Sequence, residues 1–241
     1  MNRSNADALD LWDALERVTN VTARFVRPRF FKNMGHSGQV PEQIQMLRRM
    51  VTQCDVHTVC EVGFNAGHSA TAFLHGLQTR LKSFDFFRLP YSNASQQYIS
   101  ECYPGRVEYF RGSTRETVPR YVSGVQAAEQ PPCDLWFIDG DHRTPMAAID
   151  LRNALQAASA DATIIADDCT ERYPAVQAAW RKMVLRGDLM ASFNYSVELP
   201  FPAGLKGWCV GSKKSLGNGL AHHRLTRRGQ KCLHRVGFRS G

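Results

Sequence analysis

The sequence predicts an α/β protein with a doubly wound, mostly parallel sheet of seven strands, preceded by two helices and completed by a C-terminal hairpin. Strand-like apolar runs alternate with helical patterns over residues 58–185, and repeated β-then-α units imply a parallel sheet covered on both faces. The length of 241 residues and a hydrophobic content of 43% suit one well-packed domain. No apolar run approaches the roughly 20 residues that span a bilayer, so we expect no transmembrane helix.

Two amphipathic helices are expected first, because apolar residues recur at helical spacing over residues 8–26 and again after Pro41. Five strand patterns follow, each with a helical segment behind it. We expect these strands at 58–62, 82–87, 107–110, 134–138 and 163–166, and the helical segments at 68–77, 94–102, 116–122, 146–158 and 173–185. The last two strands, 192–197 and 207–211, are separated by so short a connection that a hairpin is favoured.

The charged residues are unevenly distributed along the chain. Nine of the 30 Lys and Arg residues lie after Glu198, whereas all 22 acidic residues lie at or before it, so the net charge of +8 belongs to the C-terminal end. We divide the chain into an N-terminal helical cap (residues 1–55), a core (56–212) and a basic tail (213–241). Nucleic acid or an anionic surface is therefore expected as a partner of the tail alone.

The seven cysteines contain no C-x-x-C pair, and an odd number cannot all pair within one chain. Because several lie in strand patterns, we expect buried, reduced thiols rather than a disulfide or zinc framework. Four N-x-S/T sequons, at Asn2, Asn20, Asn93 and Asn194, point mildly toward secretion. The first residues lack the apolar stretch of a secretory signal, so a cytoplasmic location is the first expectation.

The first motif lies where the strand at 58–62 ends, in the spacing Glu61-x-Gly63-x-Asn65-x-Gly67. Its glycines let the backbone pass close to a ligand, and Asn65 tolerates left-handed backbone angles better than most residues. The dinucleotide-binding fingerprint would need glycine at positions 65 and 68, where this chain has Asn65 and His68. The motif therefore predicts a nucleoside-binding turn of another kind.

This spacing resembles motif I of the class I S-adenosylmethionine-dependent methyltransferases, and the resemblance covers residues 58–170. It implies a Rossmann-like methyltransferase fold with S-adenosylmethionine as cofactor. Glu61 would anchor the methionine amino group, and Asp85 would bind the ribose hydroxyls. Ser113 stands where related enzymes often carry an Asp that reads the adenine. The implied cofactor-binding residues are Glu61, Gly63, Asn65, Gly67, Ser69, Asp85, Ser113 and Asp139.

The second motif, Asp139-Gly140-Asp141-His142, follows the fourth strand, and Asp167-Asp168 follows the fifth. This arrangement resembles the metal-dependent small-molecule O-methyltransferases of the catechol and caffeoyl-coenzyme A type and of the sugar and antibiotic type. The resemblance implies Asp139, Asp167 and Asp168 as ligands of Mg²⁺ or another divalent cation, since oxygen ligands suit this ion. It implies His142 and Asp139 as catalytic residues, with His142 as the base. Base catalysis without a metal is the alternative.

The function predicted from these motifs is methyl transfer to the oxygen of a small hydroxylated molecule. The Asn/Asp-Pro-Pro-Tyr signature of the amino-methylating enzymes is absent, which favours oxygen as the acceptor. We expect the acceptor to be selected by residues 27–40, 169–174 and 200–205. Two other functions stay open, an RNA or protein methyltransferase that uses the basic tail and a non-catalytic protein that binds the cofactor. A homodimer is an open expectation as well.

Overall fold

The computed structural model describes residues 3–25, 40–199 and 204–213, and it has the predicted α/β architecture. Its seven-stranded sheet has the order β3-β2-β1-β4-β5-β7-β6, which is that of an open, doubly wound sheet. Strands β1 to β5 are parallel, whereas β7 runs antiparallel to both β5 and β6. The predicted fold class, with its mostly parallel sheet and its C-terminal hairpin, is confirmed.

The elements begin and end close to the predicted positions. The strands are β1 (Thr58–Val62), β2 (Arg80–Asp85), β3 (Val107–Arg111), β4 (Cys133–Ile138), β5 (Ala158–Ala166), β6 (Leu189–Leu199) and β7 (Gly204–Lys213). The helices are α1 (Arg3–Ala23), α2 (Pro41–Gln53), α3 (His68–Leu74), α4 (Pro90–Cys102), α5 (Thr114–Gln126), α6 (Met146–Ala157) and α7 (Pro174–Leu185). The strands β5, β6 and β7 are longer than predicted, because their outer residues are held by strand pairing rather than by an apolar pattern.

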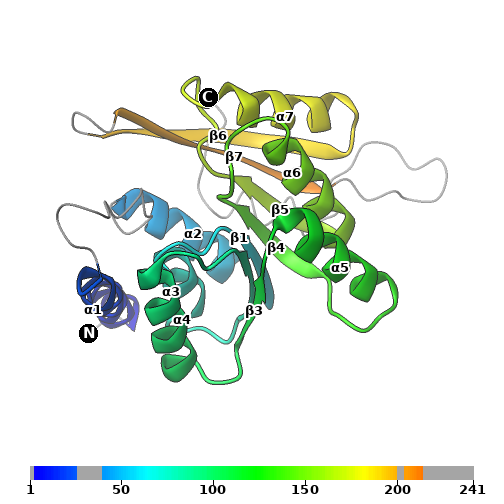
Figure 1. Ribbon diagram of the computed structural model, residues 1–241. Helices are drawn as coiled ribbons and strands as arrows, with labels where there is room; N and C mark the ends of the chain where they lie inside the picture. Colours follow the sequence, from blue (N-terminus) through cyan, green and yellow to red (C-terminus); the bar gives the residue numbers. More distant parts are fainter. Residues whose placement is uncertain (1–2, 26–39, 200–203, 214–241) are drawn as a thin grey trace.

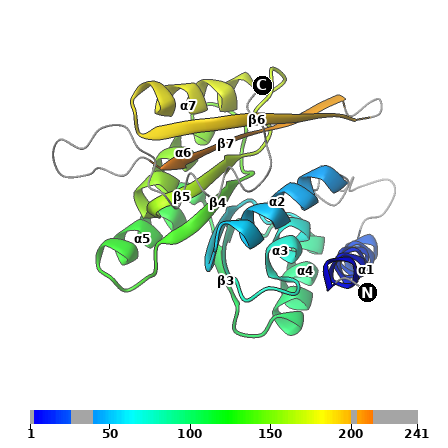
Figure 2. The ribbon, with the colours of Figure 1, turned by 180° about the vertical axis from the view of Figure 1, so that it is seen from behind.

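The helices cover the sheet on both faces, as Figures 1 and 2 show: α2, α3 and α4 lie on one side and α5, α6 and α7 on the other. Each side has its own apolar core, one centred on Leu47, Phe73 and Phe137 and the other on Trp136, Leu151 and Trp180. The first helix packs outside α3 and α4, where Thr19 Oγ1 lies 2.9 Å from His68 Nε2. These two cores hold the strand ends that form the site in a rigid frame.

The carboxyl ends of the three central strands lie in register at one edge of the sheet. The N–H of Asp139 donates to the Val62 carbonyl at 2.8 Å, and the N–H of Asp167 donates to the Ile138 carbonyl at 2.9 Å. These bonds continue the parallel ladder by one residue past each strand. The two motifs are therefore neighbours, since the turn after β1 and the residues after β4 and β5 leave the sheet side by side.

The expectation of reduced thiols is wrong for five of the described cysteines: Cys54 is disulfide-bonded, and four others form two pairs at the sheet. Cys60 of β1 and Cys133 of β4 form a disulfide, and so do Cys169 and Cys209 of β7, with Cα atoms 5.8 and 5.5 Å apart. All four are buried, as predicted. Adjacent strands bring the side chains of each pair together, although the residues are far apart in the sequence and no spacing motif connects them.

Some sequence-based predictions concern residues that the structure does not describe. This holds for residues 214–241 of the basic tail, for 26–39, and for 200–203 of the hairpin connection. The division into cap, core and tail stays a prediction, and so do the cytoplasmic location, the tail's anionic partner and the homodimer. Among the described residues, no helix is long and apolar enough to cross a membrane.

Candidate active site

The turn after β1 is shaped by its first glycine. Gly63 has a φ of +91°, and a Cβ atom at this position would lie 2.0 Å from the carbonyl oxygen of Asp139. Asn65 adopts the left-handed conformation with a φ of +49°, as predicted for the residue that replaces a glycine. Its side-chain oxygen accepts a hydrogen bond from the Tyr91 hydroxyl at 2.7 Å. Gly63 thus brings the turn against the end of β4, where the second motif begins.

Glu61 supports this turn from inside the protein. Its side chain is fully buried, and its two oxygens accept hydrogen bonds from the hydroxyls of Ser69 and Ser83. Burial raises the pKa of Glu61 to about 8, although the two hydroxyls lower it. Glu61 and Ser69 therefore act together in holding the loop. The direct contacts of these two residues with a cofactor stay predictions.

Asp85, at the end of β2, holds the same turn from the other side. One of its carboxylate oxygens accepts the N–H groups of Phe64 and Asn65 at 2.7 and 3.1 Å, and the other accepts the N–H of Phe87 at 2.8 Å. A carboxylate has about four acceptor positions, so one stays available for a ligand hydroxyl. The next residue, Phe86, leaves 43% of its surface exposed, with the Arg88 guanidinium 4.1 Å from its ring centroid.

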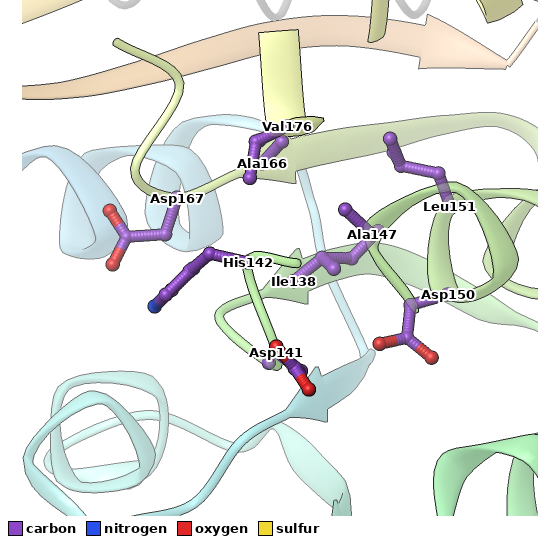
Figure 3. Close-up of a pocket in the computed structure, with 10 residues that line it drawn as sticks. Ile138, Asp141, His142, Ala147, Asp150, Leu151, Ala166, Asp167 and Val176 are labelled. Atoms are coloured by element: carbon purple, nitrogen blue, oxygen red, sulfur yellow. The ribbon is translucent and has the colours of Figure 1, made fainter. Parts of the chain in front are cut away.

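Ser113 is the N-cap of α5, where its hydroxyl accepts the N–H of Arg115 at 3.3 Å. Across from it, Asp150 of α6 is almost completely buried and hydrogen-bonded to Thr114, and burial raises its pKa to about 6. Asp150 lines a pocket together with Gly140, Asp141 and His142 (Figure 3). The region predicted to read an adenine thus contains a buried carboxyl from another helix, which the sequence did not indicate.

The second motif brings a histidine and two carboxyls together. Asp139, His142 and Asp168 each offer one ligand atom, and these atoms lie within 4.8 Å of one another. His142 Nε2 lies 3.1 Å from Asp168 Oδ2, and the His142 ring packs against Tyr173 with centroids 4.7 Å apart. The neighbouring Asp141 forms an ion pair with Arg143 at 2.6 Å instead. His142 is therefore held between Asp168 and the ring of Tyr173.

Lys206 of β7 completes this cluster. Its Nζ donates to Asp167 Oδ2 and to Asp168 Oδ1, both at 2.7 Å, and only 20% of the lysine side chain is exposed. In the sequence, Lys206 is one of the nine basic residues that follow Glu198. In the fold it lies at the carboxyl edge of the sheet, because β7 is antiparallel to β5 and begins where β5 ends. The predicted hairpin was the feature of the sequence from which this position of Lys206 could have been inferred.

The electrostatics of this cluster follow from its burial. Burial and the charge of Asp167 raise the pKa of Asp139 well above its usual value, and burial and the same charge raise the pKa of Asp168. Burial alone would lower the pKa of Lys206, but the carboxylates of Asp167, Asp139 and Asp168 raise it above its ordinary value. Lys206 is therefore a permanent cation among three acidic groups.

The predicted metal ligands do not fit a Mg²⁺ ion while Lys206 holds this position. The lysine engages both Asp167 and Asp168, and the second oxygen of Asp168 faces His142. A lysine ammonium has three donors and no lone pair, so it cannot itself be a metal ligand. Mg²⁺ requires oxygen ligands at about 2.0–2.1 Å in octahedral geometry. An ion between Asp167 and Asp168 would meet the ammonium at contact distance.

Asp139 joins the two parts of the site. It lines a small pocket with the turn residues Gly63, Asn65 and Ser69, and it also belongs to the cluster with His142 and Asp168. Figure 3 shows the side chains of His142 and Asp167 extending to the same side, while Asp150 projects from α6 elsewhere in the pocket. On β7, Trp208 is buried and stacks on Tyr195, so it belongs to the core.

Comparison with known proteins agrees with this architecture. Residues 60–169 match the family model described as a methyltransferase domain, a segment that runs from β1 to the residues after β5 and includes most of the cluster. This match agrees with the resemblance of residues 58–170 to the class I methyltransferases. No curated protein matches the sequence.

Solved structures share the fold at low sequence identity. The O-methyltransferase TomG from Streptomyces achromogenes, involved in tomaymycin synthesis and solved with SAM, aligns with a TM-score of 0.64 and 18% identity over 84% of this chain and 90% of that one. An O-methyltransferase from Bacillus cereus in complex with SAH aligns at 0.62 and 19% over 84% and 91%. The N-methyltransferase NodS from Bradyrhizobium japonicum aligns at 0.55 and 12% over 72% and 96%. The fold alone therefore does not select the acceptor atom.

Proposed function

We propose that this protein transfers a methyl group from S-adenosylmethionine to a hydroxyl oxygen of a small molecule, with His142 as the base. One observation carries the proposal: Asp139 lines the pocket of the glycine turn and at the same time adjoins the pair of His142 and Asp168. A donor seated at the turn and an acceptor beside the histidine would then be neighbours. Positioning of this kind can supply about 7 to 11 kcal/mol of a reaction barrier.

The cofactor would bind along the carboxyl ends of β1 and β2. The pocket of Gly63, Asn65 and Ser69 suits the methionine end, and the remaining acceptor position of Asp85 suits a ribose hydroxyl. The exposed ring of Phe86 offers a surface on which a base can stack. When bound, the cofactor supplies a methyl group on a positively charged sulfur. The chain's own task is to orient the acceptor and to remove its proton.

His142 would take the proton from the acceptor hydroxyl. The imidazole is the side chain best suited to proton transfer near neutral pH. Asp168 accepts from Nε2 and Tyr173 packs on the ring, so the orientation of the histidine is set before any substrate arrives. The negative charge of Asp168 would also stabilise the imidazolium that forms. This arrangement supports base catalysis, with no step that depends on a divalent metal.

An oxygen acceptor agrees with three features. The amino-methylating Asn/Asp-Pro-Pro-Tyr signature is absent, His142 offers a base for a hydroxyl proton, and the structurally similar TomG and Bacillus cereus proteins are O-methyltransferases. The NodS similarity is the reason for testing amines as well. The acceptor would enter near Tyr173, from the loop that follows Asp168.

Calorimetric titration with S-adenosylmethionine and its demethylated product tests the cofactor part of the proposal. We expect micromolar binding to the full chain, and the absence of binding for both compounds would contradict it. Phe86→Ala should weaken binding by about tenfold, since stacking of a base on an aromatic ring contributes about 1 to 3 kcal/mol. Phe25→Ala is the matched control, because Phe25 has the same exposed fraction of 43% and follows α1 instead of a strand of the sheet.

A screen of hydroxylated compounds and amines, each incubated with the full chain and labelled cofactor, tests the acceptor part. The proposal expects label in hydroxyl compounds and none in the matched amines. Label in amines alone would overturn the choice of oxygen without affecting the cofactor site. Deletion of residues 214–241 in the same screen should leave small-molecule turnover intact, and loss of turnover would favour a substrate held by the tail.

A further inference from the structure

Lys206 contacts two of the three acidic residues that the sequence predicts as metal ligands. The lysine side chain reaches from the start of β7 to the residues after β5, and its Nζ is 2.7 Å from one oxygen of Asp167 and one of Asp168. Asp167 has no exposed side-chain surface and Asp168 has 11%. Two carboxylates so deeply buried require a cation, because an unpaired buried charge costs several kcal/mol. The chain itself supplies that cation.

The backbone fixes Lys206 in this position. The N–H of Cys169 donates to the carbonyl of Gly207 at 2.9 Å, and the disulfide between Cys169 and Cys209 ties the same two segments covalently. Gly207 leaves no room for a side chain here, since a Cβ would lie 2.7 Å from Thr170. The residues that follow Lys206 are therefore fastened to the loop that carries Asp168. The Lys206 backbone is held beside the carboxylates, and the hydrogen bonds to Asp167 and Asp168 hold the ammonium.

A chain of contacts connects Lys206 to the proposed base. Asp168 receives Lys206 at one oxygen and His142 at the other, at 2.7 and 3.1 Å. Both oxygens of the carboxylate are therefore committed, and the carboxylate plane is set by the lysine on one side and the histidine on the other. Loss of the lysine would free Asp168 to rotate, and the histidine would lose its fixed partner. Lys206 is a positioning residue for His142.

We propose that Lys206 is a built-in cation that replaces a divalent metal in this site and positions His142 through Asp168. The inference rests on the proposed methyl transfer for its catalytic consequence. The exclusion of the metal rests on the contacts of Lys206 with Asp167 and Asp168 and on that of His142 with Asp168, whatever the reaction. Turnover should therefore be the same with EDTA as with added Mg²⁺.

Calorimetric titration of the full chain with Mn²⁺, in the presence of the demethylated cofactor, tests the exclusion directly. We expect no stoichiometric binding at this site in the wild-type protein. Binding of one Mn²⁺ that Asp168→Asn abolishes would overturn the proposal. Binding that survives Asp168→Asn lies elsewhere and agrees with it. The demethylated cofactor is titrated separately, so failure of the proposed function shows as absent nucleoside binding whatever the Mn²⁺ result.

Replacement of Lys206 tests whether its ammonium group is what prevents a metal ion from binding. Lys206→Met keeps most of the side-chain volume and removes the charge, and we expect Mn²⁺ to bind this variant at least tenfold more tightly than the wild type. Equal affinity in the two proteins would overturn the proposal. Lys213→Ala is the matched control, since Lys213 lies on the same strand and donates to the carbonyl of Ala158 at 2.7 Å. Thermal unfolding of each variant checks its fold, and the wild-type titration stands even if Lys206→Met does not fold.

Kinetics with a hydroxyl acceptor test the positioning role. Lys206→Met should lower kcat by about 10- to 100-fold with KM for the cofactor unchanged, because the cofactor contacts lie at the other strands. Lys206→Arg should recover part of kcat, since it restores a cation beside Asp168. A purely structural role would reduce cofactor affinity and kcat together, and that result would overturn the positioning part.

Discussion

The carboxyl ends of β1 and β2 and those of β4 and β5 both gather buried or partly buried acidic residues, but the partners of these residues differ. At β1 and β2, Glu61 and Asp85 bind uncharged groups within the described part of the chain, namely two hydroxyls and three backbone N–H groups. At β4 and β5, Asp167 and Asp168 bind a lysine and a histidine. The neutral partners hold the turn after β1 in a fixed conformation. The charged partners form a cluster in which a proton can be transferred.

The charged region is the one whose loss should affect turnover most. His142→Ala should lower kcat by about 100- to 10,000-fold, the usual contribution of a general base, while cofactor affinity stays unchanged. Steady-state kinetics and calorimetry measure the two effects. His57→Ala is the control, because His57 also faces an aspartate, at 3.7 Å from Asp55, but precedes β1 at the opposite edge of the sheet. Full activity of His142→Ala would remove the base from the mechanism.

Gly63 is the point where the two regions touch, so its replacement should damage both. Gly63→Ala should lower the free energy of unfolding by about 2 to 5 kcal/mol, because the new Cβ would collide with the Asp139 carbonyl and the backbone is left-handed. Gly105→Ala separates the cost of the steric collision from the cost of the left-handed backbone. Gly105 has a φ of +70° but open space around it, so only the backbone penalty of about 1 to 2 kcal/mol applies. Equal losses in the two variants, by chemical denaturation, would show that close approach contributes nothing.

Glu61, whose partners are uncharged, should make the free energy of unfolding depend on pH. Folding raises the pKa of Glu61 from 4.5 to about 8, so the folded protein binds a proton that the unfolded chain releases between these values. Stability from this group is complete below pH 4.5 and is lost as the pH rises to 8, by about 1.4 kcal/mol per pH unit at most. Glu61→Gln should remove this slope, whereas Glu101→Gln, on the exposed side of α4, should keep it. Parallel slopes for wild type and Glu61→Gln in denaturation curves would contradict the assignment.

The alternation of strands and helices was readable from the sequence because each element has its own periodicity. β1 and α7 lie within a residue of their predicted bounds, and the motif around Glu61 lies on the predicted turn. Asn65 was identified as a left-handed residue because few side chains tolerate that conformation. By contrast, the outer ends of β5, β6 and β7 depend on pairing with a neighbouring strand, which no local pattern records.

Local sequence also determined where acidic residues and a histidine follow strands, and hence that two functional motifs meet at one edge of a parallel sheet. It did not determine what neutralises them. Lys206 is 38 residues from Asp168, and the cysteines of the two disulfides are 73 and 40 residues apart. Their encounters depend on the antiparallel placement of β7 beside β5 and on the register of β1 with β4. The partner of a buried charge is decided by tertiary structure, because Coulombic and covalent contacts act through space and leave no spacing in the chain.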